Sequence, residues 1–167
     1  MFKQPIFKAL GAVSCLLLVG PSGAAQPKPG HQHGATAQDE LVEAPAACAL
    51  CGMNRTHFAK SRMLAVYPDG TRVGTCSIHC MAIELKRTLA NPPKVLLVGA
   101  YGDSAHRLID ARAASWVIGG SERGVMTAQP KWAFPDMGEV TEFLREKGGK
   151  EANYAEAMAA ASQESDH

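Results

Sequence analysis

The sequence has no excess of charge of either sign. Its 167 residues contain 17 Lys and Arg against 16 Asp and Glu, which gives a formal net charge of +1. Proteins that bind nucleic acid usually carry a basic patch or stripe, and no basic block is present here. The balance of charge therefore argues against nucleic acid as a partner.

The sequence also lacks an apolar run long enough to span a bilayer, which takes about 20 residues in a helix. The run from Ala9 to Gly20 is shorter than that, and Lys3 and Lys8 lie on its N-terminal side. Small residues up to Ala25 then form a cleavage site. This layout predicts a signal peptide over residues 1–25, whose removal leaves a mature charge near −1.

A lipoprotein is the alternative form of export, because Cys15 lies in a segment that loosely resembles a lipoprotein box. The apolar run continues beyond it through residues 16–19, which favours cleavage and a soluble exported protein. Residues 26–45 are rich in Pro, Gly, Gln and Ala and are predicted to form a flexible linker. Within the linker, His31 and His33 either bind metal loosely or belong to a solvated tether.

Cysteine is scarce, and outside the leader it is confined to one window. The four residues form a C-x-x-C pair and a C-x-x-x-C pair, at Cys48, Cys51, Cys76 and Cys80. Such pairs indicate metal binding or thiol redox chemistry, and an even number in an exported protein also allows two disulfides. No thioredoxin-like βαβ pattern surrounds the first pair, which argues against thiol–disulfide exchange.

The second pair is predicted to lie at the start of a helix. Ser77 is a natural N-cap residue, so Cys76 would precede the helix while His79 and Cys80 would lie in its first turn. The positive end of the helix dipole stabilises thiolate, the form that binds metal. A loop pair together with a helix-start pair is typical of small zinc modules.

Methionine favours copper over zinc. Met53 follows Cys51 by two residues, and Met126 lies in a loop that also contains Gly and Ser instead of in an apolar stripe. Thioether sulfur binds Cu(I) and is a poor zinc ligand. The candidate metal ligands are therefore Cys48, Cys51, Met53, Cys76, His79, Cys80 and Met126.

The remaining pattern predicts an α+β fold with two related α+β units packed together. Expected strands are a hairpin over 62–75 and short segments at 95–98, 107–110, 115–118 and 131–134. Expected helices follow Ser77 and Asp136, the latter as a capping-box start, and Gly148 and Gly149 end the second helix. The predicted divisions are 1–25, 26–45, a first unit over 46–100, a second over 101–150 and a polar, partly helical tail over 151–167. The expected core, which should not need a metal, comprises Leu85, Leu89, residues 95–98, Phe134, Phe143 and Leu144.

An ordered series of motifs resembles the NosL family of accessory copper-binding proteins linked to nitrous oxide reductase and denitrification. The series comprises Cys48-Ala-Leu-Cys-Gly-Met53, Asp69-Gly70, Cys76-Ser-Ile-His-Cys-Met81, Ile109-Asp-Ala-Arg112, Trp116-Val-Ile-Gly-Gly-Ser121, Gly124-Val-Met-Thr127 and Ala133-Phe-Pro-Asp136. The resemblance implies two ββαβ-like units and a periplasmic protein that delivers Cu(I) to the reductase. It places the family's loop methionine at Met126 and its Cys-Gly-Met segment at Cys51 and Met53, although Val125 and Thr127 replace the usual proline and glycine.

Together these observations lead us to expect a Cu(I) metallochaperone and not an enzyme. Ligand exchange needs few ligands, so we expect Cys51, Met126 and one of Cys48, Cys80 or His79. The rival is a structural zinc-binding interaction domain that uses all four cysteines, and a third possibility is a disulfide-stapled domain without metal.

Overall fold

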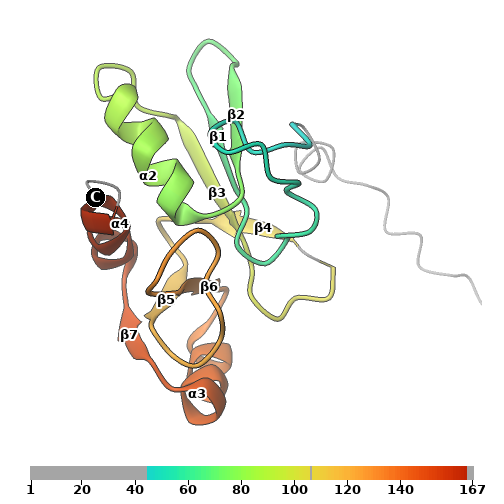
Figure 1. Ribbon diagram of the computed structural model, residues 1–167, viewed down its shortest axis with the longest axis vertical. Coiled ribbons are helices and arrows are strands. Elements are labelled where there is room, and N and C mark those ends of the chain that lie inside the picture. Colours follow the sequence, from blue (N-terminus) through green and yellow to red (C-terminus); the bar gives the residue numbers. More distant parts are fainter. Residues whose placement is uncertain (1–44, 106, 165–167) are drawn as a thin grey trace, which may run out of the picture. The chain divides into compact units, whose positions relative to one another are not determined.

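The structure, a computed structural model, describes residues 45–105 and 107–164. The predicted signal peptide and nearly all of the predicted linker, including His31 and His33, lie outside the described residues. The described part contains two antiparallel sheets and three helices, which confirms the α+β class (Figure 1). None of its helices is both long and apolar enough to cross a membrane.

The first unit runs through β1 (Met63–Val66), β2 (Arg72–Thr75), α2 (Ile78–Arg87) and β3 (Val95–Gly99). Its strands lie in the order β2-β1-β3, and β4 (Leu108–Asp110) adds a fourth strand beside β3. The strand expected at 107–110 therefore forms, but it pairs with the first sheet and not with the second unit. The hydrogen bonds of β3 determine this, because Val98 is in register with Ile109.

The second unit repeats this connectivity. It contains β5 (Ser115–Ile118), β6 (Lys131–Phe134), α3 (Met137–Lys147) and β7 (Lys150–Ala152), with strands in the order β6-β5-β7. Each unit is thus a ββαβ element, as the family resemblance implied, and in each the first strand is central. The helix α4 (Tyr154–Glu164) follows the second unit and packs against α2 and β5.

Turn and cap residues explain where several elements begin and end. Asp69 accepts a hydrogen bond from the backbone amide of Thr71 in the turn between β1 and β2, where Gly70 has a φ of 89°. Asp136 caps α3 by accepting from the amides of Gly138 and Glu139, as predicted. These local bonds satisfy donors that the turn and the helix start would otherwise leave unpaired.

Three sequence predictions need correction. Ser77 occupies the N-cap position of α2, but its side chain makes no capping hydrogen bond. Leu89 is 80% exposed, because α2 ends at Arg87 and the residue lies beyond the amphipathic face. Val95 is 36% exposed at the start of β3, so it contributes less to the core than residues 96–98.

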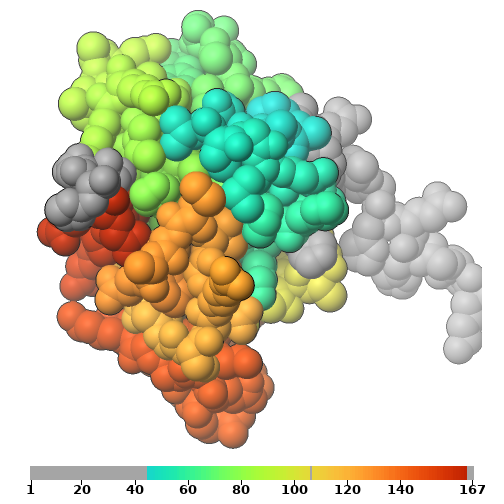
Figure 2. Space-filling view, viewed as in Figure 1, coloured from blue at the N-terminus to red at the C-terminus, as the bar shows by residue number. Residues whose placement is uncertain are grey.

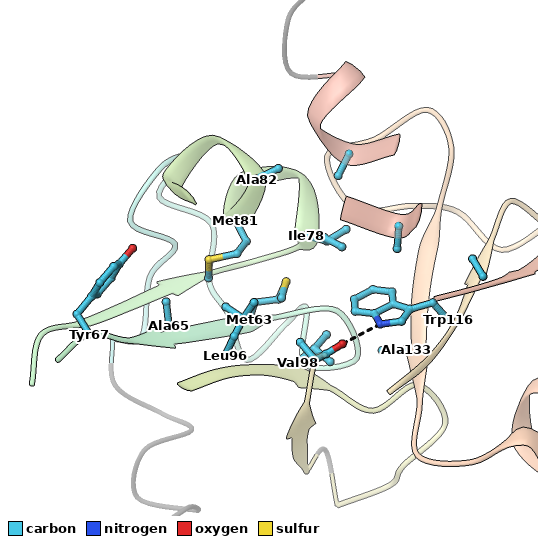
Figure 3. Packing of buried hydrophobic residues seen from close by; sticks show 14 residues of the cluster. Met63, Ala65, Tyr67, Ile78, Met81, Ala82, Leu96, Val98, Trp116 and Ala133 are labelled. Atoms are coloured by element: carbon cyan, nitrogen blue, oxygen red, sulfur yellow. Dashed lines mark hydrogen bonds between the residues drawn. The ribbon is translucent and has the colours of Figure 1, made fainter. Parts of the chain in front are cut away.

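One buried cluster joins the two units. Met63 and Val98 of the first sheet pack with Met81 of α2 and with Trp116 of β5, as Figure 3 shows. The indole Nε1 of Trp116 donates to the carbonyl of Ala111 at 3.0 Å, which satisfies its only donor within the core. This shared core means that the loops of the second unit are held against the first.

Candidate metal centre

The first cysteine pair lies on a tight loop. The amide of Cys48 donates to the carbonyl of Met53 at 2.8 Å, and the amide of Gly52 donates back to the carbonyl of Cys48 at 2.9 Å. Gly52 has a φ of 76°, a conformation that side-chain-bearing residues rarely adopt. Glycine at this position therefore allows the loop to close and to bring Cys48 and Cys51 toward one site.

The second cysteine pair lies at the start of α2. Cys76 ends the segment after β2, and Cys80 lies in the first turn of the helix. The hydroxyl of Ser61 donates to the carbonyl of Cys76 at 2.8 Å, which fixes the backbone just before the helix. Both cysteines are fully buried, so the helix start presents them inward toward the loop pair.

The four sulfur atoms form one compact group. Cys51 Sγ lies 3.6 Å from Cys76 Sγ and 3.9 Å from Cys80 Sγ, and the last two are 3.7 Å apart. With Cys48 included, all four sulfurs lie within 4.8 Å of one another. Four thiolates at about 2.3 Å from a central ion would be about 3.8 Å apart, so the spacing fits a single metal ion.

The cysteines are free thiols in the structure, and their protonation is unequal. Hydrogen bonding from Cys80 lowers the pKa of Cys76 to about 6, although burial opposes the shift. The pKa of Cys80 is raised by its hydrogen bond to Cys76 and by burial, while burial is the main cause that raises the pKa of Cys51. Within the group Cys76 is thus the most acidic of the shifted thiols, and a bound cation would replace the protons of the group.

One edge of the cysteine group is open. Cys51 is exposed, whereas the other three cysteines are buried. A neighbouring pocket of about 530 Å³ is lined by apolar, sulfur-containing and cationic side chains. Its lining consists of Met53, His57, Phe58, Lys60, Arg123, Gly124, Val125 and Met126.

The loop between β5 and β6 forms the far wall of this pocket. Val125 packs against the buried cysteines of the first unit and also against the aromatic cluster of the second. In Figure 2 the orange loop lies directly against the turquoise cysteine segment. Met126 can approach the thiols only if the second unit folds back on the first, and the packing of its neighbour Val125 against the buried cysteines shows that this loop does so.

Met126 has an unusual backbone at the rim of the pocket. Its φ is 55°, and it is the one non-glycine residue with a positive φ in the part of the chain that the structure describes. Its side chain remains 45% exposed. Such conformations cost free energy and concentrate at functional sites, so the outlier supports a role for Met126.

The predicted ligand residues are therefore not all together. The compact group contains the four cysteines, and Met53 packs against it. Met126 shares the adjacent pocket with Met53. No nitrogen of His79 belongs to the compact group among the described residues, and its Nδ1 is buried without a hydrogen-bond partner there.

Arg55 is a residue that the sequence did not single out. It is 1% exposed, and its guanidinium donates to the carbonyl oxygens of Pro45, Met63 and Thr75 at 2.5, 3.1 and 3.3 Å. These bonds tie the cysteine loop to β1 and β2. An arginine between two cysteine motifs gives no sequence signal for such a role, because the carbonyls it meets come from distant backbone.

Comparisons with known proteins bear on the fold and on the family. A structure of the copper chaperone NosL from Shewanella denitrificans is similar with a TM-score of 0.55 and 21% identity, over 69% of this chain and 91% of that chain. At that identity the likeness establishes the fold. Among curated proteins, none matches the chain. The family model for NosL matches residues 40–161, which is most of the sequence, and the chain therefore belongs to the NosL family.

Proposed function

We propose that the protein is an exported Cu(I) metallochaperone of the periplasm that carries copper as cargo and is not an enzyme. The proposed client is a cuproprotein, and the motif resemblance in the sequence makes nitrous oxide reductase the first choice. Support for copper as the cargo comes from the combination of thiols and thioethers, since both are ligands that Cu(I) prefers.

The observation that carries the proposal is the open, sulfur-lined edge of the cysteine group. Cys51 is exposed, and Met53, which packs against the cysteine group, lines the adjacent pocket together with Met126. A metal held only by buried ligands has no route to a partner, whereas an exposed cysteine ligand with thioethers in the adjacent pocket allows one ligand to be exchanged at a time. This is the arrangement that transfer between two proteins requires.

The ligand set that we favour is Cys51 and Met126 with a third sulfur from the buried side of the group. Cys80 is one of the alternatives that the sequence left open, and its sulfur lies 3.9 Å from that of Cys51. Cys76 is nearer, at 3.6 Å, and its lowered pKa favours the thiolate form that binds metal. His79 is less favoured, because neither of its ring nitrogens belongs to the compact group found among the described residues.

A structural zinc site is the second candidate function. The separations of 3.6, 3.7 and 3.9 Å between three of the sulfurs match those of a tetrahedral four-thiolate site. In that case Cys48, Cys51, Cys76 and Cys80 would all bind one ion, and Met126 would contribute nothing.

An anaerobic titration with Cu(I) against a chromophoric chelator separates these functions. Loss of a sulfur ligand in Met126→Ala should weaken Cu(I) binding by at least tenfold, or about 1.4 kcal/mol, and leave zinc affinity unchanged. Met137→Ala is the matched control, because Met137 is equally exposed, at 45%, but does not line the pocket. Equal Cu(I) affinities for wild type and Met126→Ala would remove Met126 from the site and favour the four-cysteine zinc site.

Export is tested separately. N-terminal sequencing of the mature protein should give Gln26 or a near neighbour as the first residue. A mature protein that begins with an acylated Cys15 would instead be a lipoprotein, and the soluble form would be rejected.

A further inference from the structure

Lys131 is a buried cation on β6 near the Met126 loop. Its side chain is 0% exposed, and its Nζ lies 3.0 Å from Glu164 Oε1, 2.8 Å from the carbonyl of Gln129 and 3.1 Å from Thr127 Oγ1. An ammonium group has three donors, and all three are used here. Burial of this charge is tolerated because each of the three donors has a hydrogen-bond partner and one of the partners is a carboxylate.

Glu164 is the acceptor at the centre of the network. Besides Lys131, its carboxylate accepts from the hydroxyl of Thr127 and from the backbone amide of Gln129. Burial alone would raise the pKa of Glu164, but the bonds from Thr127 and Lys131 hold it below the ordinary value. A carboxylate in the last turn of a helix opposes the helix dipole, so helix stability does not explain its position in α4.

The network acts on the residues that follow Met126 directly. Thr127 is the next residue, and a Cβ atom at Gly124 would lie only 2.6 Å from the Thr127 methyl carbon. The loop tip at Gly124 is therefore packed tightly against the Thr127 side chain, whose hydroxyl is hydrogen-bonded to Glu164. A strained backbone such as that of Met126 persists only where its surroundings fix it, and the bonds to Glu164 provide that fixation.

The helix α4 also contacts the cysteine side of the site. It packs against α2, whose first turn contains Cys80, and Lys86 of α2 donates to the carbonyl of Ser162 at 3.0 Å. Ala157 and Ala161 are fully buried in the core that the two units share. One helix thus contacts both the element that presents thiols and the loop that presents the thioether.

We propose that Glu164 is a positioning residue for the metal site, because it fixes the Met126 loop to α4 and thereby sets the thioether relative to the cysteine thiols. The inference rests on the proposed function, since it takes Met126 as a Cu(I) ligand. Glu164 does not touch the ion. Its effect on copper passes through Thr127 to Met126.

A double-mutant cycle on the mature protein tests this role. Cu(I) affinity is measured for wild type, Glu164→Ala, Met126→Ala and the double variant, all shown to be folded by far-UV circular dichroism. We expect Glu164→Ala to weaken Cu(I) binding about tenfold, the size typical of outer partners of metal ligands. In the Met126→Ala background it should cause no further loss.

Two variants of Thr127 distinguish the positioning role from a purely structural effect of removing the Glu164 charge. Thr127→Val keeps the packed methyl group but loses the hydroxyl, and should weaken Cu(I) binding. Thr127→Ser restores the hydroxyl and should bind nearly as wild type. Glu142→Ala is the control for loss of an acidic residue, because Glu142 is exposed on α3 and should leave affinity unchanged.

The possible failures are distinguishable. An equal loss from Glu164→Ala in both backgrounds, or no loss in the wild-type background, would overturn the positioning role while Met126 remained a ligand. An unchanged affinity in Met126→Ala would instead reject the thioether ligand, and the positioning role with it.

Discussion

The strained backbone of Met126 makes a prediction in which stability and copper affinity change independently of each other. A left-handed conformation costs a side-chain-bearing residue about 1–2 kcal/mol. Glycine avoids that cost but loses about 0.4–1 kcal/mol more conformational entropy on folding. The Met126 side chain is 45% exposed, and the burial that its removal costs is nearly the same in the Gly and Ala variants. Met126→Gly should therefore be more stable than Met126→Ala by about 1 kcal/mol.

The two variants form a matched pair, since both lack the thioether and only one retains the strain. Urea unfolding of the reduced, metal-free proteins measures the difference in stability, and Cu(I) competition should show the same loss, at least tenfold, in both. If Met126→Gly is no more stable than Met126→Ala, the positive φ stores no strain. If both variants bind copper as wild type does, the strain serves something other than the metal.

Three further predictions concern the surroundings of the site. Arg55→Ala should cost about 3 kcal/mol of unfolding free energy, because it leaves buried carbonyls without donors, and a loss under 1 kcal/mol in urea unfolding would contradict this. The lowered pKa of Glu164 means that the ionised carboxylate adds to the free energy of unfolding above its ordinary pKa of 4.5, and that this contribution is lost as the pH falls through the lower folded value. Urea unfolding as a function of pH should therefore show a flatter dependence in this range for Glu164→Gln than for wild type. Metal removal with a chelator should leave the circular dichroism spectrum of a folded protein, because the core is built without the ion, whereas complete unfolding would favour structural zinc.

Local patterns in the sequence predicted most of the fold. The hairpin, the apolar strand before residue 100 and the Asp136 cap all depend on neighbours within a few residues, so spacing and turn chemistry were sufficient. β7 was missed because Lys150–Ala152 is short and mostly polar, and its pairing with β5 is a tertiary effect. Leu89 was misplaced because an apolar periodicity continued past the residue where the helix ends.

The site was predictable where its residues are close in sequence. Cysteine spacing indicated the group of four thiols, since a loop pair and a helix-start pair can converge. The bonds from Lys131 to Glu164 could not be foreseen, because 33 residues separate them and the tail gave no sign of docking. The same holds for Arg55, because its partners are backbone carbonyl oxygens, which every residue has and which give no sequence signal.

The repeated ββαβ connectivity suggests how metal preference could evolve within this fold. In the first unit the hairpin between the paired strands is a short turn around Gly70, while in the second it is the long loop that presents Met126. Loops tolerate insertion and substitution far better than strands do. Lengthening or trimming one hairpin could therefore add or delete a soft ligand while both cores stayed intact, so that selection could act on the choice of cargo without a penalty in folding.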